Sequence, residues 1–223
     1  MKITAIATKK GGAGKTTLAT NLAVESANAG YKTLIIDLDV DQRTALNWFN
    51  MRENRGNPLV VSPENIGKFT DLLEAAKERI DRVFIDTQGA ESDLGNAAMK
   101  CADFVLIPCK SSGFDSAAQK TTAQTVLTLK KEAGFVITQA PARGQEVQRT
   151  KEILSGFGVP IYQGQISQLK IYKEAALFAS TAIEDEPKGK GAEEIEALFQ
   201  WVENRMDVDP LLSELQGAVC DEH

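Results

Sequence analysis

The sequence predicts an α/β fold in which a mostly parallel sheet carries helices on both faces. Two observations lead to this prediction. Short apolar segments alternate along the chain with longer amphipathic or polar segments, as strands joined by helices do. The apolar segments are nearly continuous instead of alternating with polar residues, which is typical of parallel strands buried on both sides. With 223 residues, the chain is long enough for one domain with a large core.

The first half of the chain shows how each element is predicted. The apolar run at residues 3–7 predicts a buried strand, and a glycine-rich turn joins it to a helix that ends at Gly30. Leu and Ile dominate a second strand at residues 33–36. In the helix predicted over residues 67–80, apolar side chains recur at the spacing of one helix face, namely Phe69, Leu72, Leu73 and Ala76.

The same alternation continues to residue 205, where the last predicted helix ends. Further strands are predicted at residues 58–61, 82–86, 104–108, 135–138 and 159–162. Further helices are predicted at residues 42–55, 91–102, 114–132, 144–157, 167–178 and 192–205. We therefore expect a single domain over residues 1–206 and an acidic tail over residues 207–223. Ligands bind at the carboxyl ends of parallel strands, so motifs at those ends are the candidates for function.

Residues 10–17, Lys-Gly-Gly-Ala-Gly-Lys-Thr-Thr, follow the first predicted strand and form a phosphate-binding loop. Its glycines let backbone N–H groups approach phosphate oxygens, and the helix N-terminus adds partial positive charge. Lys15 is expected to reach the β- and γ-phosphates, and the Thr16 hydroxyl to bind Mg²⁺. The predicted nucleotide-binding residues of this loop are Lys10, Gly11, Gly12, Ala13, Gly14, Lys15, Thr16 and Thr17.

Two further motifs follow at the ends of predicted strands. Asp37 and Asp39 are spaced i, i+2, so both carboxylates project to the same side of an extended chain. Asp86 ends an apolar run, where we expect it to hold Mg²⁺ through water. Magnesium ligands are therefore predicted at Thr16, Asp37 and Asp86, and γ-phosphate contacts at Thr87, Gln88 and Gly89.

Composition narrows the classes of function. The formal net charge is -6, so bulk charge does not indicate a nucleic-acid-binding protein, although a local basic patch would suffice. Cys101, Cys109 and Cys220 lack metal-binding spacing and favour reduced cytosolic thiols. No segment is apolar enough for a membrane span, and Met1 leads directly into the first strand. We therefore expect a cytoplasmic protein with no membrane partner.

Because a second lysine precedes its glycines, the loop resembles the deviant Walker A motif of the ParA/MinD family of P-loop ATPases, over roughly residues 1–205. The resemblance implies the P-loop NTPase fold, ATP and Mg²⁺ as ligands, and an ATP-dependent homodimer in which Lys10 reaches the partner's nucleotide. It also implies that Asp39 takes part in hydrolysis, which makes Lys10, Lys15 and Asp39 the predicted catalytic residues. The chain departs from the family pattern at residues 40–41, where Val-Asp replaces the usual Pro.

Two weaker similarities to the same family follow later in the chain. Ser111 and Asp115 lie in a segment similar to I-P-x-x-P-S-x-x-D, which implies a place at the dimer face. An ordinary helix cap at Asp115 is the alternative. Thr138 stands where members of the family often carry Asn, which makes it the predicted contact with adenine.

In size the chain is similar to small ParA-type ATPases for plasmid or chromosome partition. The resemblance implies a nucleoid-associated protein whose ATP-bound dimer binds DNA without sequence preference, and a centromere-binding, ParB-like partner that stimulates hydrolysis. Candidates for the DNA-binding patch are Arg143, Arg149, Lys170 and Lys173. One alternative is a ParA relative that positions a protein cargo, such as a carboxysome or chemoreceptor cluster. Another is a MinD-like membrane-positioning ATPase, which the acidic tail disfavours because anionic lipid repels it.

Overall fold

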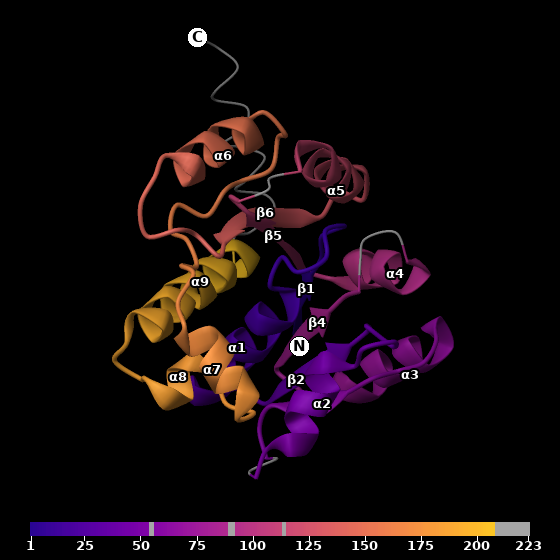
Figure 1. Ribbon diagram of the computed structural model, residues 1–223. Coiled ribbons are helices and arrows are strands. Elements are labelled where there is room, and N and C mark those ends of the chain that lie inside the picture. The colour runs from indigo at the N-terminus through magenta and orange to yellow at the C-terminus, as the bar shows by residue number, and fades with distance from the viewer. Residues whose placement is uncertain (54–55, 89–91, 113–114, 208–223) are drawn as a thin grey trace.

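Six parallel strands form one sheet in the computed structural model, which describes residues 1–53, 56–88, 92–112 and 115–207 (Figure 1). Their order is β3-β2-β4-β1-β5-β6, and each neighbouring pair is parallel. The strands are β1 Lys2–Ile6, β2 Thr33–Asp37, β3 Leu59–Val61, β4 Arg82–Asp86, β5 Phe104–Lys110 and β6 Glu132–Thr138. The predicted parallel sheet is confirmed.

Helices cover both faces of this sheet (Figure 1). They are α1 Lys15–Asn28, α2 Thr44–Met51, α3 Ile66–Ala76, α4 Asp93–Cys101, α5 Ser116–Thr128, α6 Glu146–Ser155, α7 Ile171–Leu177, α8 Ala182–Asp185 and α9 Lys190–Asp207. One buried apolar cluster lies between the sheet and α3 to α6. A second cluster lies between the opposite face and α1, α2 and α7 to α9. The prediction of a sheet covered on both faces is therefore confirmed.

Strand β4 shows why the strand sequences are continuously apolar. Val83 and Ile85 face the cluster beneath α3 to α6, whereas Phe84 faces the cluster beneath α1 and α9. Each of the three is at most 1% exposed. Since both sides of the strand are covered, a polar residue such as Asp86 is accommodated only at the strand end, where ligands have access.

Two predicted elements in the second half are wrong in extent. The helix predicted over residues 114–132 ends at Thr128, because Lys130 adopts a positive φ of 51° and the chain turns into β6. The strand predicted over residues 159–162 is reduced to one parallel bridge between Phe135 and Ile161. In the first case Glu132 already belongs to β6, and in the second the segment pairs with β6 at a single residue.

The segment after this bridge also differs from the prediction. The helix predicted over residues 167–178 begins only at Ile171. Ser167 instead lies in a loop, where its N–H and hydroxyl both donate to Glu194 at 2.8 and 2.5 Å. The short helix α8 was not predicted, because four residues are too few to show a helical period.

Paired charges join α9 to the amino ends of the strands. Arg82 at the start of β4 donates to both carboxylate oxygens of Glu203, at 2.6 to 3.0 Å. The Arg82 guanidinium also lies 4.0 Å from the centre of the Tyr31 ring. Two further pairs at this edge are Arg205 with Glu132, at 2.7 Å, and Lys2 with Asp207.

A glycine in β6 allows α9 to pack closely on the sheet. Trp201 of α9 contacts Phe104 edge to face, with ring centroids 5.6 Å apart. A Cβ added to Gly134 would lie 2.2 Å from Trp201 Cη2, so a larger residue would displace the indole. Among the helices in the described part of the chain, none is both long and apolar enough to cross a membrane.

Candidate nucleotide-binding site

The three sequence motifs meet at the carboxyl ends of β1, β2 and β4, which are neighbouring strands. Asp86 is in register with Ile6 on one side and with Asp37 on the other. A cleft of about 350 Å³ opens beside these strand ends. The predicted residues that line it are Gly11, Gly12, Gly14, Lys15, Thr16, Thr17, Asp39 and Gln88. Thr87, which the sequence predicts as a γ-phosphate contact, lines it as well. Gln42, Thr44 and Gln139 also line it, and they were not among the predicted site residues.

The glycine loop has the backbone that its sequence requires. Gly12 and Gly14 have φ values of 69° and 87°, in the left-handed region that side chains disfavour. Residues at and just after the end of β6 bind the loop. Thr138 Oγ1 donates to Ala13 O at 2.8 Å, and Gln139 Nε2 donates to Gly12 O at 2.9 Å. Two loop carbonyl groups thus accept hydrogen bonds from within the protein. These bonds stabilise the loop in a conformation that can bind an anion at the α1 N-terminus.

Lys15, the first residue of α1, lies partly buried among the acidic residues of the site. Burial lowers the pKa of its ammonium group, while the charges of Asp86 and Asp39 act in the opposite direction. The lysine therefore lies close to both predicted functional carboxylates. A cation held in this way is suited to bind phosphate oxygens by charge-assisted hydrogen bonds.

Thr16 and Asp86 form the innermost contact of the site. Thr16 Oγ1 donates to Asp86 Oδ2 at 2.6 Å. Asp86 is 1% exposed, and its other oxygen, Oδ1, has no hydrogen-bond partner among the described residues. Burial raises the pKa of this carboxyl to about 7, against the hydrogen bond from Thr16. A buried carboxylate oxygen without a donor, beside a hydroxyl, is a suitable environment for a cation.

These oxygen donors fit Mg²⁺, which binds proteins through one or two carboxylates and completes its shell with water and phosphate. Within the described residues, no group of three or more His, Cys, Asp or Glu side chains is arranged to hold a metal ion alone. A site of this kind would therefore depend on nucleotide phosphates for its remaining ligands.

The carboxylate of Asp37, unlike that of a free metal ligand, already accepts hydrogen bonds on both oxygens. It is fully buried, and its two oxygens accept hydrogen bonds from Asp39 N at 3.1 Å and Leu46 N at 3.0 Å. Burial raises the pKa of Asp37, and these N–H groups partly oppose the shift. Asp37 thus holds both ends of the loop that carries Asp39. Its role as a magnesium ligand stays a prediction.

The loops after β2 and β4 are joined across the cleft. Gln88 Nε2 donates to Asp41 Oδ2 at 2.8 Å. Asp39 is positioned by its own turn, where Gln42 N donates to Asp39 Oδ1 at 3.2 Å. The departure from the family pattern at residues 40–41 therefore supplies the carboxylate that binds Gln88, a contact that the sequence did not reveal. Gly89 lies outside the described residues.

A second hollow, of about 130 Å³, adjoins the loop on the β6 side. It is lined by Gly14, Thr17, Leu18, Thr138, Gln139, Ile166, Ser167, Gln168, Leu169, Tyr172 and Lys173. Its mainly apolar lining beside the phosphate loop suits a purine ring. The hydroxyl of Thr138 is used on Ala13, so its adenine contact stays a prediction. The segment 166–169 was missed, because a short loop has no periodic signal.

The remaining predicted residues lie away from the cleft. Asp115 caps α5, since its Oδ1 accepts Ala118 N at 3.0 Å, as an ordinary helix cap would. Arg149 on α6 donates to Gln145 at 3.2 Å. Lys170 directly precedes α7, whereas Lys173 lies within it and lines the second hollow.

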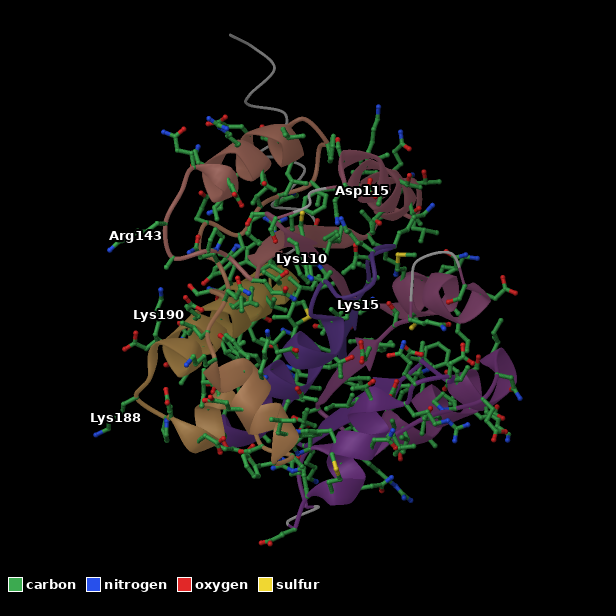
Figure 2. The ribbon with its side chains drawn as sticks, in the orientation of Figure 1. Lys15, Lys110, Asp115, Arg143, Lys188 and Lys190 are labelled. Carbon is green, nitrogen blue, oxygen red and sulfur yellow. The ribbon has the colours of Figure 1, made fainter. Side chains whose placement is uncertain are left out.

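Basic side chains nevertheless gather along one edge. Figure 2 shows Arg143 and Lys188, from loops, and Lys190, from the start of α9, extending outward on the same side of the molecule. Lys190 also lies 3.6 Å from Glu194. Residues 208–223, which make up nearly all of the predicted acidic tail, lie outside the described residues.

Comparison with known protein families decides the wider classification. The CobQ/CobB/MinD/ParA nucleotide binding domain family matches residues 4–182. The chain belongs to this family. The resemblance drawn from the phosphate loop is therefore confirmed, and so is the P-loop fold.

Curated relatives span nearly the same length as this family member. Protein ParA of Rhizobium radiobacter is 26% identical over 80% of this chain and 82% of that protein. The maintenance of carboxysome distribution protein A of Gloeobacter kilaueensis is 28% identical over 93% and 95%. The chromosome-partitioning ATPase Soj of Thermus thermophilus is 25% identical over 91% and 95%.

Solved structures show the same fold. The MinD structure from Pyrococcus horikoshii with Mg-ADP has a TM-score of 0.72 at 17% identity, covering 90% of this chain and 95% of that chain. An ATP complex of Cyanothece McdA has a TM-score of 0.71 at 19% identity, covering 94% and 97%. At these identities the likeness concerns architecture alone.

Proposed function

We propose that this chain is a ParA-like ATPase that binds ATP with Mg²⁺, hydrolyses it slowly, and uses the ATP-bound dimer to hold a cargo on DNA. The observation that carries the proposal is that Lys15, Thr16 and Asp39 line one cleft, with Asp86 hydrogen-bonded to Thr16. A phosphate-binding loop, a buried carboxylate with an unused oxygen and a second acid together provide the groups that phosphoryl transfer to water requires.

Each residue has a distinct part in the proposed reaction. The loop N–H groups and Lys15 bind the phosphates, and Asp39 orients the attacking water. Thr16 and Asp86 would hold Mg²⁺, which when bound offsets the phosphate charge. Gln88, joined to Asp41, couples the loop after β4 to the loop that carries Asp39. Asp37 keeps that second loop in place from beneath.

The dimer is proposed on the position of Lys10. This lysine is not needed to complete the phosphate loop within one protomer, and we propose that it reaches the nucleotide of a second copy. Dimerisation would bring two basic edges onto one rigid body, each with Arg143, Lys188 and Lys190 (Figure 2). Two weak patches that bind one duplex together gain affinity, so an acidic protein can still bind DNA.

DNA partition and protein-cargo positioning are both supported by relatives. Protein ParA and Soj favour partition, with a ParB-like partner and a location on the nucleoid. The carboxysome distribution protein of Gloeobacter kilaueensis, 28% identical, favours a protein cargo as the second candidate. Both use the same ATP-dependent DNA binding, so one experiment tests the common step.

Fluorescence polarisation with unrelated DNA duplexes tests this step. We expect binding with ATP and Mg²⁺ but not with ADP, no sequence preference, and a steep loss of affinity with added salt. The double variant Arg143→Glu with Lys188→Glu should abolish DNA binding and leave ATP binding intact, because neither residue lines the cleft or the second hollow. Lys68→Glu with Lys77→Glu, an equal charge change at exposed positions in α3 and just after it, is the matched control.

Two outcomes would contradict the proposal. Absence of DNA binding with ATP at low salt would remove the nucleoid role, and preference for one duplex would indicate a specific DNA reader. If the variant with Arg143→Glu and Lys188→Glu binds DNA as tightly as the control, the patch lies elsewhere. Arg149→Glu with Lys170→Glu is then the next pair to measure.

A further inference from the structure

Lys110, the last residue of β5, lies against the phosphate loop. A Cβ added to Gly12 would be 3.5 Å from Lys110 Nζ, so the ammonium group lies directly beside the loop backbone. Lys110 is in register with Thr138, whose hydroxyl supports the same loop. Figure 2 shows Lys110 among the strand ends, in the region that also holds Lys15.

The surroundings of Lys110 differ from those of Lys15. Lys15 lies close to Asp86 and Asp39 and lines the nucleotide cleft. Lys110 does not line the cleft, and in the described part of the chain its ammonium group makes no hydrogen bond or ion pair. A lysine that lies beside a phosphate loop, outside its cleft and without a carboxylate, is available for an anion from another molecule.

Other groups near the end of β5 also support an anion site. The charge of Lys10 acts on the thiol of Cys109, which precedes Lys110, so both lysines lie near the end of β5. Ser111 is 6% exposed, and its hydroxyl has no hydrogen-bond partner among the described residues. The carbonyl oxygen of the Gln119 side chain, on α5, is also buried without a partner. Unsatisfied buried polar groups are rare and mark places where a structure is completed by something else.

We propose that Lys110 binds the terminal phosphates of the ATP held by a second copy of this chain. Each protomer then contributes two lysines across the interface, Lys10 and Lys110. This inference rests on the proposed ATP-dependent dimer and adds a residue to it. The described part of its own protomer gives Lys110 no acidic partner, and the phosphates of the second copy's ATP supply that negative charge. A phosphate bound in its own cleft is faced instead by Lys15.

The test separates nucleotide binding from dimerisation. Binding of a fluorescent ATP analogue is measured at protein concentrations too low for dimers. Sedimentation velocity with ATP and Mg²⁺ then gives the dimer dissociation constant. For Lys110→Gln we expect analogue affinity within about twofold of wild type and a dimer dissociation constant raised at least about tenfold. Lys110→Arg should restore dimerisation, because it keeps the charge.

Two control variants accompany these measurements. Lys77→Ala removes an exposed lysine just after α3 and should behave as wild type. Lys10→Ala should lose the dimer, as the proposed cross-interface lysine. Thermal melting of Lys110→Gln shows whether the variant is folded, and Lys110→Arg provides a second readout if it is not.

Each result decides the inference. Normal dimerisation of Lys110→Gln would overturn it. A loss of analogue affinity in the monomer would also overturn it, because Lys110 would then act on its own nucleotide. If wild type itself fails to dimerise with ATP, the proposed function fails first, and that outcome is distinct from a failure of Lys110 alone.

Discussion

The two ends of the parallel sheet are built in opposite ways. At the amino ends of the strands, charges meet charges: Arg82 binds Glu203 through three contacts, and Arg205 binds Glu132. At the carboxyl ends, the described residues include two oxygens that are buried without a hydrogen-bond partner, Asp86 Oδ1 and the hydroxyl of Ser111. At the amino ends, Arg205 Nε is likewise unpaired, although the same guanidinium binds Glu132. Both ends belong to the same six strands, but different side chains surround them.

This difference assigns stability to the amino ends of the strands and ligand binding to the carboxyl ends. In a paired, largely desolvated charge, removing one partner leaves the other uncompensated and destabilises the fold, and the intact pair needs no ligand. A buried carboxylate with one oxygen unpaired opposes folding until a cation or proton reaches it, and Asp86 is buried in this way. The fold is therefore stabilised at one end of the sheet and prepared for nucleotide at the other.

The largest expected effect is the loss of ATP binding in Lys15→Ala. Removing the ammonium group leaves the loop without its phosphate-binding charge, and ATP affinity should fall at least about 1,000-fold, or about 4 kcal/mol. The free energy of unfolding should change little, because no ion pair of the amino end is touched. Isothermal titration calorimetry measures the affinity, and near-normal binding would contradict the phosphate-loop assignment.

At the opposite end, Arg82→Ala should destabilise the fold by about 2–3 kcal/mol without changing ATP affinity. The variant leaves Glu203, whose side chain is 14% exposed, without its cation and removes the contact with Tyr31. Chemical denaturation measures the change. Lys77→Ala, which breaks an exposed pair with Glu74, is the control and should stay within about 0.5 kcal/mol of wild type.

The smallest expected effect is an increase in the free energy of unfolding instead of a decrease. Asp86→Asn should stabilise the nucleotide-free protein near pH 8 by about 1–2 kcal/mol. Burial raises the pKa of Asp86 to about 7, so the fold favours the protonated carboxyl. Relative to the variant, wild type loses stability as the pH rises from about 4 through about 7, and the difference is constant above that range.

Denaturation of both proteins near pH 5 and near pH 8, without nucleotide or Mg²⁺, measures this dependence. An equal difference at both pH values would show that ionisation of Asp86 is not its cause. The same variant should lose the Mg²⁺ dependence of ATP binding, because an amide does not replace a carboxylate as a metal ligand. Stability and ligand binding would then change in opposite directions through one residue.

Much of the fold was predictable because its signals are local. Buried parallel strands are continuously apolar, and the phosphate loop has a nearly unique pattern of glycines and lysines. The sequence also places the loop and the two aspartate motifs at the carboxyl ends of strands, where Asp86 meets Thr16 in the structure, although the order of the strands was not predicted. These parts of the site depend on short segments whose geometry is nearly fixed by sequence.

The parts that were not predicted depend on contacts between distant segments. Asp37 holds Leu46 nine residues later, and Gln88 binds Asp41 from another strand end. The use of the Thr138 hydroxyl on Ala13 is also invisible in either segment alone. Each of these contacts is set by packing around the cleft, and none produces a periodic pattern.

The close approach of Trp201 to Gly134 has a spectroscopic consequence. The chain has two tryptophans. Trp201 lies between α9 and the sheet, near the amino ends of the strands, so its fluorescence reports whether α9 is docked. Trp48 lies on α2 beside a hollow that includes Thr16 and Thr44 of the nucleotide cleft, so its emission reports changes there. Replacing one tryptophan with Phe isolates the signal of the other, and folding and nucleotide occupancy become separately visible without an added label.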